Sequence, residues 1–161
     1  MSLVDDATFK QVMRRWASGV TVLTSRAGSE IHGMTVSAFS SVSAEPPLVL
    51  VCANRSSTTR DVIDAGGVFA VNILSSDQEA ISTRFAVVPG AERFDGVSWT
   101  EGNTGVPLID GALAQLECRV RSAHLEGTHT IYIGEVLHGT VDGSKAPLLY
   151  FDGSYRRIDA D

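Results

Sequence analysis

The stretch that decides the fold is residues 32–54, HGMTVSAFSSVSAEPPLVLVCAN. Its first half is β-type sequence that carries five small hydroxyl side chains within nine residues: Thr35, Ser37, Ser40, Ser41 and Ser43. A break at Pro46–Pro47 follows, and then an apolar strand that ends at Asn54. Small side chains allow main-chain N–H and C=O groups to approach a flat polar ligand, although a sandwich strand with one wet face has a similar pattern. The segment therefore predicts two adjacent strands and leaves open whether they bind a ligand.

The next segment, residues 54–67 (NRSSTTRDVIDAGG), changes from strand to helix. A glycine pair, Gly66–Gly67, is typical of a helix C-terminus. The helix N-terminus presents unpaired N–H groups next to three hydroxyls and two cations, a combination that favours a phosphate site: Ser56, Ser57, Thr58, Arg55 and Arg60. The simpler alternative is an N-cap, which needs only one of these hydroxyls and no ligand.

Length and composition describe an ordinary globular chain. The 161 residues are 43% hydrophobic and 20% charged, which suits a single domain spanning residues 1–161 with a sizeable core. A net charge of -6 argues against a nucleic-acid partner, because phosphate contacts need a basic surface. No apolar run approaches the roughly 18 residues of a membrane span. The charged residues among the first twenty positions do not fit a signal peptide, so a cytoplasmic location is expected.

The pattern along the chain predicts many strands and three short helices. The first helix is expected over residues 6–17, capped by Asp5 or Asp6, with an apolar stripe of Phe9, Val12, Met13 and Trp16. A third helix is expected to open at a capping box, Ser76 to Glu79, and to pack through Ile81 and Phe85. Strands are expected over 20–24, two stretches up to 53, and 68–74, 112–125, 130–141 and 148–151, with a long excursion over 87–110. This is typical of a mainly β, closed antiparallel barrel decorated by helices.

Familiar catalytic signatures are missing from the chain. There is no G-x-G-x-x-G after a strand, no G-x-S-x-G and no H-E-x-x-H. Cys52 and Cys118 lie in predicted strands and are interpreted as small buried side chains. His129 is the most interesting histidine, because it follows a turn and begins a strand, where an imidazole can point into a cleft. A surface histidine is the commoner occupant of such a position.

Seven fragments in order resemble one known family. They are residues 9–25 (FKQVMRRWASGVTVLTS), 32–59 (HGMTVSAFSSVSAEPPLVLVCANRSSTT), 69–86 (FAVNILSSDQEAISTRFA), 93–96 (RFDG), 105–120 (GVPLIDGALAQLECRV), 127–136 (GTHTIYIGEV) and 146–155 (APLLYFDGSY). Through these fragments the chain resembles the short-chain flavin reductases of two-component monooxygenases. The resemblance implies an FMN-binding split β-barrel, antiparallel and Greek-key-like, that forms a homodimer and binds flavin between its subunits.

The resemblance also implies roles for particular residues. The main chain of Thr35, Val36, Ser37 and Ala38 would lie against the isoalloxazine ring, flanked by Ser41, Val42 and Ser43. Cys52, Ala53 and Asn54 would follow the ribityl chain, and Ser56, Ser57 and Thr58 would hold phosphate. Arg84, Phe85 and Ala86 would close the far side of the flavin, with His129 and Tyr155 near the nicotinamide. Family members often have Gly-Asp-His where this chain has Gly127-Thr128-His129, so the role of an acid at that position is in question.

The activity implied is that of an NAD(P)H:flavin oxidoreductase, with His129 as the catalytic residue. Hydride would pass from NADH or NADPH to FMN or FAD, and the reduced flavin would serve a partner monooxygenase. The sequence does not choose between the two flavins or between the two nicotinamides. Two alternatives remain: a flavin-binding module without turnover, and a Cys–His hydrolase that uses Cys52 or Cys118 with His129.

Overall fold

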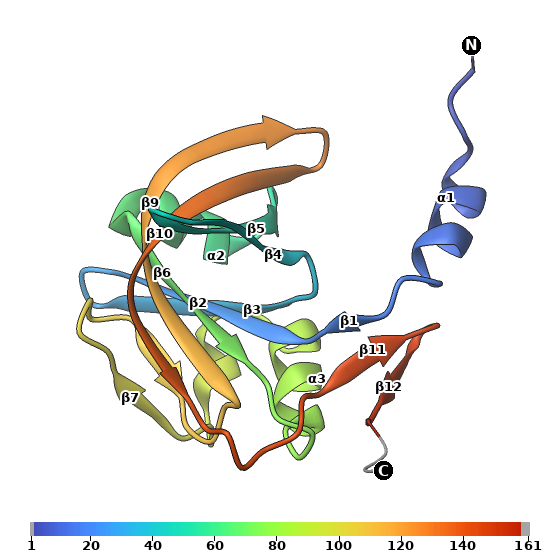
Figure 1. Cartoon of the computed structure of the whole chain (residues 1–161). Helices are drawn as coiled ribbons and strands as arrows, with labels where there is room; N and C mark the ends of the chain where they lie inside the picture. Colours follow the sequence, from blue (N-terminus) through green and yellow to red (C-terminus); the bar gives the residue numbers. More distant parts are fainter. Residues whose placement is uncertain (1, 159–161) are drawn as a thin grey trace.

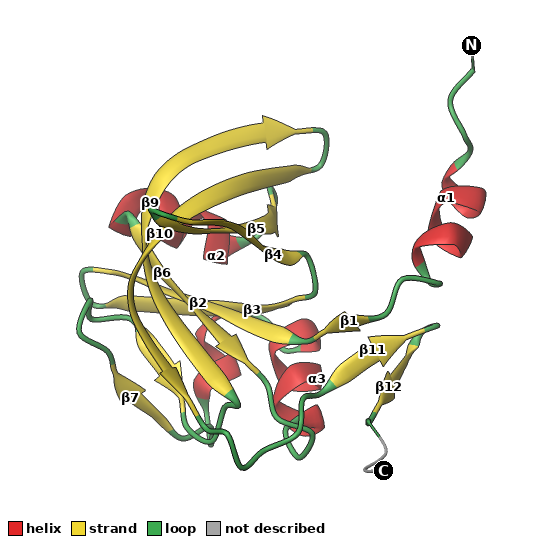
Figure 2. Ribbon diagram, viewed as in Figure 1, coloured by secondary structure: helices red, strands yellow, loops and turns green. Residues whose placement is uncertain are grey.

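A computed structural model describes residues 2–158 and shows a mainly β chain with three short α-helices among them (Figures 1 and 2). The helices are α1 (Asp6–Met13), α2 (Thr58–Gly66) and α3 (Glu79–Val87), with a 3₁₀ turn, η1, at Gly90–Phe94. The strands are β1 (Ser18–Gly19), β2 (Thr21–Ala27), β3 (Glu30–Val36), β4 (Phe39–Ala44), β5 (Pro47–Asn54), β6 (Val68–Ile73), β7 (Trp99–Glu101), β8 (Pro107–Ile109), β9 (Ala114–Glu126), β10 (His129–Val141), β11 (Leu149–Phe151) and β12 (Ser154–Arg156). None of the described helices is long and apolar enough to cross a bilayer.

The main sheet has seven antiparallel strands in the order β3-β2-β6-β9-β10-β5-β4. Its two edge strands, β3 and β4, follow each other in the chain and are joined by the short link Ser37–Ala38. The sheet curls round so that these edges face each other across the opening in Figure 1. The predicted closed barrel is therefore split along one side, which agrees with the split barrel that the resemblance implied.

The interior is filled by two clusters of buried apolar side chains. The larger lies inside the barrel and includes Leu23, Val51, Phe69 and Tyr132, each fully buried. The second lies under α3 and η1 and contains Phe85 and Phe94, whose rings meet edge to face at 5.0 Å. The predicted packing of Ile81 and Phe85 is confirmed, because Ile81 lies against this second cluster.

Helix α2 is bounded as its sequence predicts. Ser57 is the N-cap, and its Oγ accepts a hydrogen bond from the Arg60 N–H at 3.2 Å. Gly67 ends the helix in the left-handed conformation (φ 69°). A Cβ atom at Gly66 would come within 1.9 Å of the Arg26 carbonyl oxygen, so the end of α2 lies directly against β2. This close approach fixes the helix on the barrel.

The other two helices differ from their predicted bounds. Helix α1 is capped by Asp5, as predicted, but ends at Met13 rather than residue 17, because the N–H groups of Arg15 and Trp16 bond three residues back instead of four. Helix α3 begins at Glu79, without the predicted capping box. The Gln78 side chain instead accepts a hydrogen bond from the Ser75 N–H (3.1 Å), which ties the approach to the helix together.

The excursion over residues 87–110 is an ordered cover that contains η1, β7 and β8. Its attachment depends on Glu117 of β9, which is 3% exposed. The carboxylate accepts four hydrogen bonds from the β7–β8 turn: from the N–H and side-chain amide of Asn103 (3.1 and 3.2 Å), and from the N–H and hydroxyl of Thr104 (2.7 and 2.8 Å). Burial alone would raise the pKa of Glu117, but these bonds outweigh it and hold the pKa below its ordinary value.

We expect Glu117→Gln to lower the free energy of unfolding by on the order of 1–3 kcal/mol at pH 7, because the amide cannot accept all four bonds. Since the folded-state pKa is depressed, the contribution of Glu117 is present above the unfolded pKa and disappears as pH falls through the folded value. Denaturant titrations between pH 7 and pH 3 should show the two proteins converging. Glu135→Gln is the control, because Glu135 makes a more exposed ion pair with Arg119 (2.5 Å). A pH-independent difference would contradict the prediction.

Candidate functional site

The link between β3 and β4 presents main chain at the surface. Ser37 and Ala38 are exposed, whereas the side chain of Val36 before them is buried. The Phe39 N–H donates to the Ser37 carbonyl (3.0 Å), which makes the link tight. The Cys52 N–H donates to the Ala38 carbonyl (3.0 Å), which joins the link to β5. Small side chains on a fixed backbone form a shelf against which a flat ring can lie.

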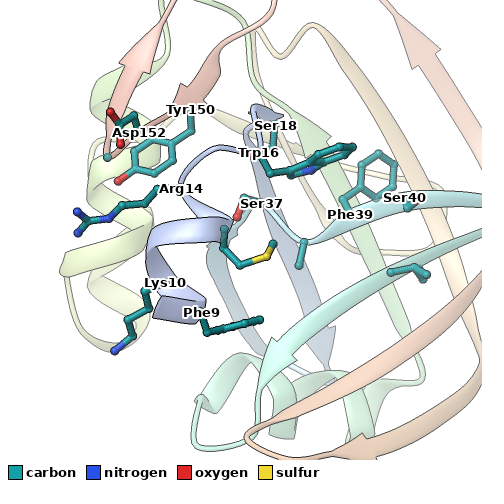
Figure 3. A pocket seen from close by; sticks show the side chains of 14 residues that line it. Phe9, Lys10, Arg14, Trp16, Ser18, Ser37, Phe39, Ser40, Tyr150 and Asp152 are labelled. Atoms are coloured by element: carbon teal, nitrogen blue, oxygen red, sulfur yellow. The ribbon is translucent and has the colours of Figure 1, made fainter. Parts of the chain in front are cut away.

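A groove of about 510 Å³ adjoins this shelf, between α1, the link and the β11–β12 turn (Figure 3). Aromatic side chains line much of it: Phe9, Trp16, Phe39 and Tyr150. Of the residues predicted to bind flavin, it includes only Ser37 and Ala38. The remaining predicted residues lie outside it.

The loop from Asn54 to Thr58 precedes α2 and is shaped by its own side chains. The Asn54 side-chain oxygen accepts from both the N–H (3.0 Å) and the hydroxyl (2.8 Å) of Ser56. Ser57 caps the helix and also donates to the Met34 sulfur at 3.5 Å. Thr58 is the first helical residue and is exposed. The N-cap is therefore confirmed at Ser57. Ser56 and Thr58 are exposed at the helix N-terminus, and the phosphate site stays a prediction.

The two cations near this loop are engaged elsewhere. Arg60 forms ion pairs with Asp61 (3.3 Å) and Asp64 (2.8 Å), and Asp64 also accepts a hydrogen bond from the buried Tyr132 hydroxyl (2.5 Å). Arg55 holds the β9–β10 turn: its N–H donates to the Thr128 carbonyl (3.1 Å) and its guanidinium to the Gly127 carbonyl (3.3 Å). A phosphate at this loop would be bound chiefly by N–H groups and hydroxyls.

His129 is the first residue of β10 and is exposed. It pairs with Asn54 of β5 on one side and with Glu126 of β9 on the other. Its Nδ1 lies 2.9 Å from the Thr128 hydroxyl. The turn that carries the imidazole is thus adjacent to the loop that precedes α2.

Helix α3 lies on the other side of the shelf. The Thr35 hydroxyl donates to the Ser82 carbonyl (2.6 Å), and the Ser82 and Tyr155 hydroxyls are 2.8 Å apart. Arg84 donates to the carbonyls of Glu92 (2.6 Å) and Arg93 (2.9 Å). Ser82 therefore connects two predicted site segments, and nothing in the sequence pattern marked it.

The structure brings the predicted residues into one continuous chain of contacts. His129 pairs with Asn54, Cys52 of the same strand bonds the Ala38 carbonyl, and Thr35 reaches Tyr155 through Ser82. Ser41 pairs with Val49 and Ser43 with Leu48 of β5, which places residues 41–43 at the outer edge. Val36, Ala53 and Phe85 have buried side chains, so contact with a ligand falls to their main chain.

The two thiols lack the surroundings of a nucleophile. Burial raises the pKa of Cys52, and burial together with the neighbouring Glu117 carboxylate raises the pKa of Cys118 to about 12. His129 bonds to Thr128 rather than to either thiol. These observations count against the Cys–His hydrolase.

Comparisons with known proteins agree on one family. Residues 13–159 match the flavin reductase like domain. The NADH-dependent FAD reductase of Streptomyces globisporus is 38% identical over 161 residues, which covers 98% of this chain and 88% of that protein. The reductase component of 4-hydroxyphenylacetate 3-monooxygenase from Thermus thermophilus is 39% identical over 150 residues, covering 93% of this chain and 95% of that protein.

The similarity extends to three dimensions. The NADH:FAD oxidoreductase of Streptomyces globisporus C-1027, solved in complex with NAD and FAD fragments, superposes with a TM-score of 0.92. The two chains are 38% identical, and the match covers 100% of this chain and 99% of the other. The shelf, the loop before α2 and the turn that carries His129 thus lie in a chain that belongs to the flavin reductase like family.

Proposed function

We propose that this chain is a single-domain NAD(P)H:flavin oxidoreductase that reduces FMN or FAD and supplies reduced flavin to a partner monooxygenase. The observation that carries the proposal is the continuous chain of contacts from His129 through Asn54, Cys52 and Ala38 to Thr35. It aligns a backbone shelf, a helix N-terminus and an exposed imidazole along the open side of the barrel. The names of relatives, which include FAD and FMN reductases and monooxygenase components, support the same activity.

The residues present fit a flavin. The shelf at Ser37–Ala38 offers main chain without bulky side chains, as a tricyclic ring requires. The loop at Ser56–Thr58 offers hydroxyls and helix N–H groups, as a phosphate requires. The first of these segments would orient the ring, and the second would hold its tail.

The chemistry needs little from the side chains. Bound flavin supplies a ring that accepts hydride from a nicotinamide, so the protein's task is orientation and exclusion of water. The backbone of residues 35–38 fixes one ring against the barrel. The His129 Nε2, on the ring side opposite the bond to Thr128, is available to hydrogen-bond the carboxamide of the nicotinamide. No strong acid or base takes part in this scheme.

A homodimer would complete the site. Helix α1 buries none of its residues and stands apart from the barrel in Figure 1. The apolar stripe of α1 and of the turn after it is exposed to an unusual degree for side chains of this type: Phe9 54%, Val12 63%, Met13 48% and Trp16 73%. A second copy of the chain, packed on this stripe and on the groove beside it, would cover the apolar surface and enclose the shelf.

Anaerobic mixing of the purified protein with FMN, FAD or riboflavin and with NADH or NADPH tests the function. We expect the flavin absorbance near 450 nm to bleach as the nicotinamide is oxidised, with FMN bound more tightly than riboflavin if the loop at Ser56–Thr58 holds phosphate. The same assay separates the alternative: a non-catalytic flavin-binding module would bind flavin and leave it oxidised. That result with both nicotinamides would reject the reductase.

Replacing His129 by Ala should slow hydride transfer or raise the KM for the nicotinamide about tenfold, while the flavin Kd changes less than twofold. The reason is that the imidazole contacts the nicotinamide and the flavin is held by main chain. Stopped-flow reduction and fluorescence titration of FMN measure the two quantities. His138→Ala, an exposed position farther along β10, is the control. Wild-type kinetics in His129→Ala would remove the residue from the mechanism.

Sedimentation velocity tests the dimer. The wild-type chain should sediment as a dimer, and the double variant Met13→Asp, Trp16→Asp should sediment as a monomer, because two charges would have to be buried in an apolar interface. Gln11→Glu, on the same helix but outside the apolar stripe, is the matched control. A monomeric wild type at micromolar concentration would contradict the expectation.

A further inference from the structure

The only side-chain hydrogen bond that the structure gives to His129 comes from the residue before it. The Thr128 hydroxyl oxygen lies 2.9 Å from Nδ1 of the imidazole, and both residues are exposed. At this position the family resemblance led us to expect an acid. In this chain the group beside the imidazole is therefore a hydroxyl and not a carboxylate.

The backbone around this pair is held firmly. Gly127 has a positive φ of 56°, which suits the tight turn between β9 and β10. Arg55 fixes the same turn from outside, through its N–H to the Thr128 carbonyl (3.1 Å) and its guanidinium to the Gly127 carbonyl (3.3 Å). His129 then enters β10 paired on both sides, with Asn54 and Glu126. The backbone positions of Thr128 and His129 are consequently set by the fold, and the contact between their side chains orients the ring.

A hydroxyl acts on an imidazole differently from a carboxylate. An ionised carboxylate only accepts hydrogen bonds, so it selects the Nδ1–H tautomer and favours the charged ring. The Thr128 hydroxyl can donate to a bare Nδ1 or accept from Nδ1–H, and it adds no charge. It therefore restrains the ring and leaves Nε2 directed away from Thr128, free to bond a ligand beside the β9–β10 turn.

We propose that Thr128 is a positioning residue: its hydroxyl donates to Nδ1, which holds the ring of His129 and favours the Nε2–H tautomer, so that Nε2 meets the nicotinamide in a defined geometry. The proposal rests on the proposed function for the identity of the ligand. The relation between Thr128 and the imidazole does not depend on that identity, because both side chains are brought together in the chain alone.

The test compares Thr128→Val, which keeps the β-branched shape and lacks the hydroxyl, with Thr128→Ser, which keeps the hydroxyl. With the His129 ring uncharged, the ¹⁵N chemical shifts of the ring report its tautomer ratio. We expect the ratio to change in the Val variant and to return to the wild-type value in the Ser variant. Thr140→Val is the control: it lies on β10, the strand that begins at His129, and its hydroxyl bonds Gln115 instead (3.1 Å). The same tautomer ratio in wild type and Thr128→Val would overturn the proposal.

Kinetics provide the second measurement. Thr128→Val should raise the KM for NADH or NADPH about fivefold, the factor that corresponds to a neutral hydrogen bond of about 1 kcal/mol, with the FMN Kd unchanged. The effect should vanish in the His129→Ala background, because Thr128 acts through the imidazole. The proposal would be overturned by an equal rise in KM when Thr128→Val is added to His129→Ala, or by a KM for Thr128→Ser as high as that of Thr128→Val. A wild-type protein without nicotinamide oxidation would reject the proposed function, while the ¹⁵N measurement would still decide the role of Thr128.

Discussion

The hydrogen bond from the Cys52 N–H to the Ala38 carbonyl is the constraint on which the arrangement of the site depends. It lies where the chain passes from one edge of the seven-stranded sheet to the other, and it joins the link between β3 and β4 to β5. It continues the β4–β5 ladder one residue beyond the Phe39–Val51 pair and so holds the link against β5. On one side of the link, the Thr35 hydroxyl of β3 bonds the Ser82 carbonyl of α3, and on the other side β5 leads to the loop before α2. A ligand bound at the link would meet main chain, whose position is set by the sheet itself.

Much of this could be predicted from the sequence because the relevant signals are local. The Gly66–Gly67 pair ends α2 as predicted, and Ser57 is the one hydroxyl that caps it. The two stretches expected up to residue 53 are three strands, β3, β4 and β5, because the link at Ser37–Ala38 divides the first of them. The order of the seven fragments along the chain then predicted the split barrel through the family resemblance, which the comparisons confirm. A turn or a cap depends on a few neighbouring residues, so its signal survives without knowledge of the tertiary structure.

The surroundings of the charged groups were harder to predict from the sequence, and the phosphate site stays a prediction. Arg60 was predicted beside a phosphate, yet it pairs with Asp61 and Asp64, and the latter is held by Tyr132 of β10. Glu117 anchors a turn that precedes it by more than a dozen residues, and no local signal marks it. The bonds of Tyr132 to Asp64 and of Glu117 to its turn join groups far apart in the sequence, and only the fold brings them together.

Arg55 shows how the fold couples the two halves of the site. It lies between Asn54, which pairs with His129, and Ser56, which begins the hydroxyl-rich entry to α2, while its own bonds hold the turn of Gly127 and Thr128. A group bound at the α2 entry and a group bound at His129 would therefore be placed relative to each other by one short segment of backbone. Two ligands that must react by direct transfer need a fixed relative position more than they need a strong acid or base. If the proposed site binds both ligands, the segment from Asn54 to Ser56 would meet that requirement through backbone geometry, without a catalytic dyad.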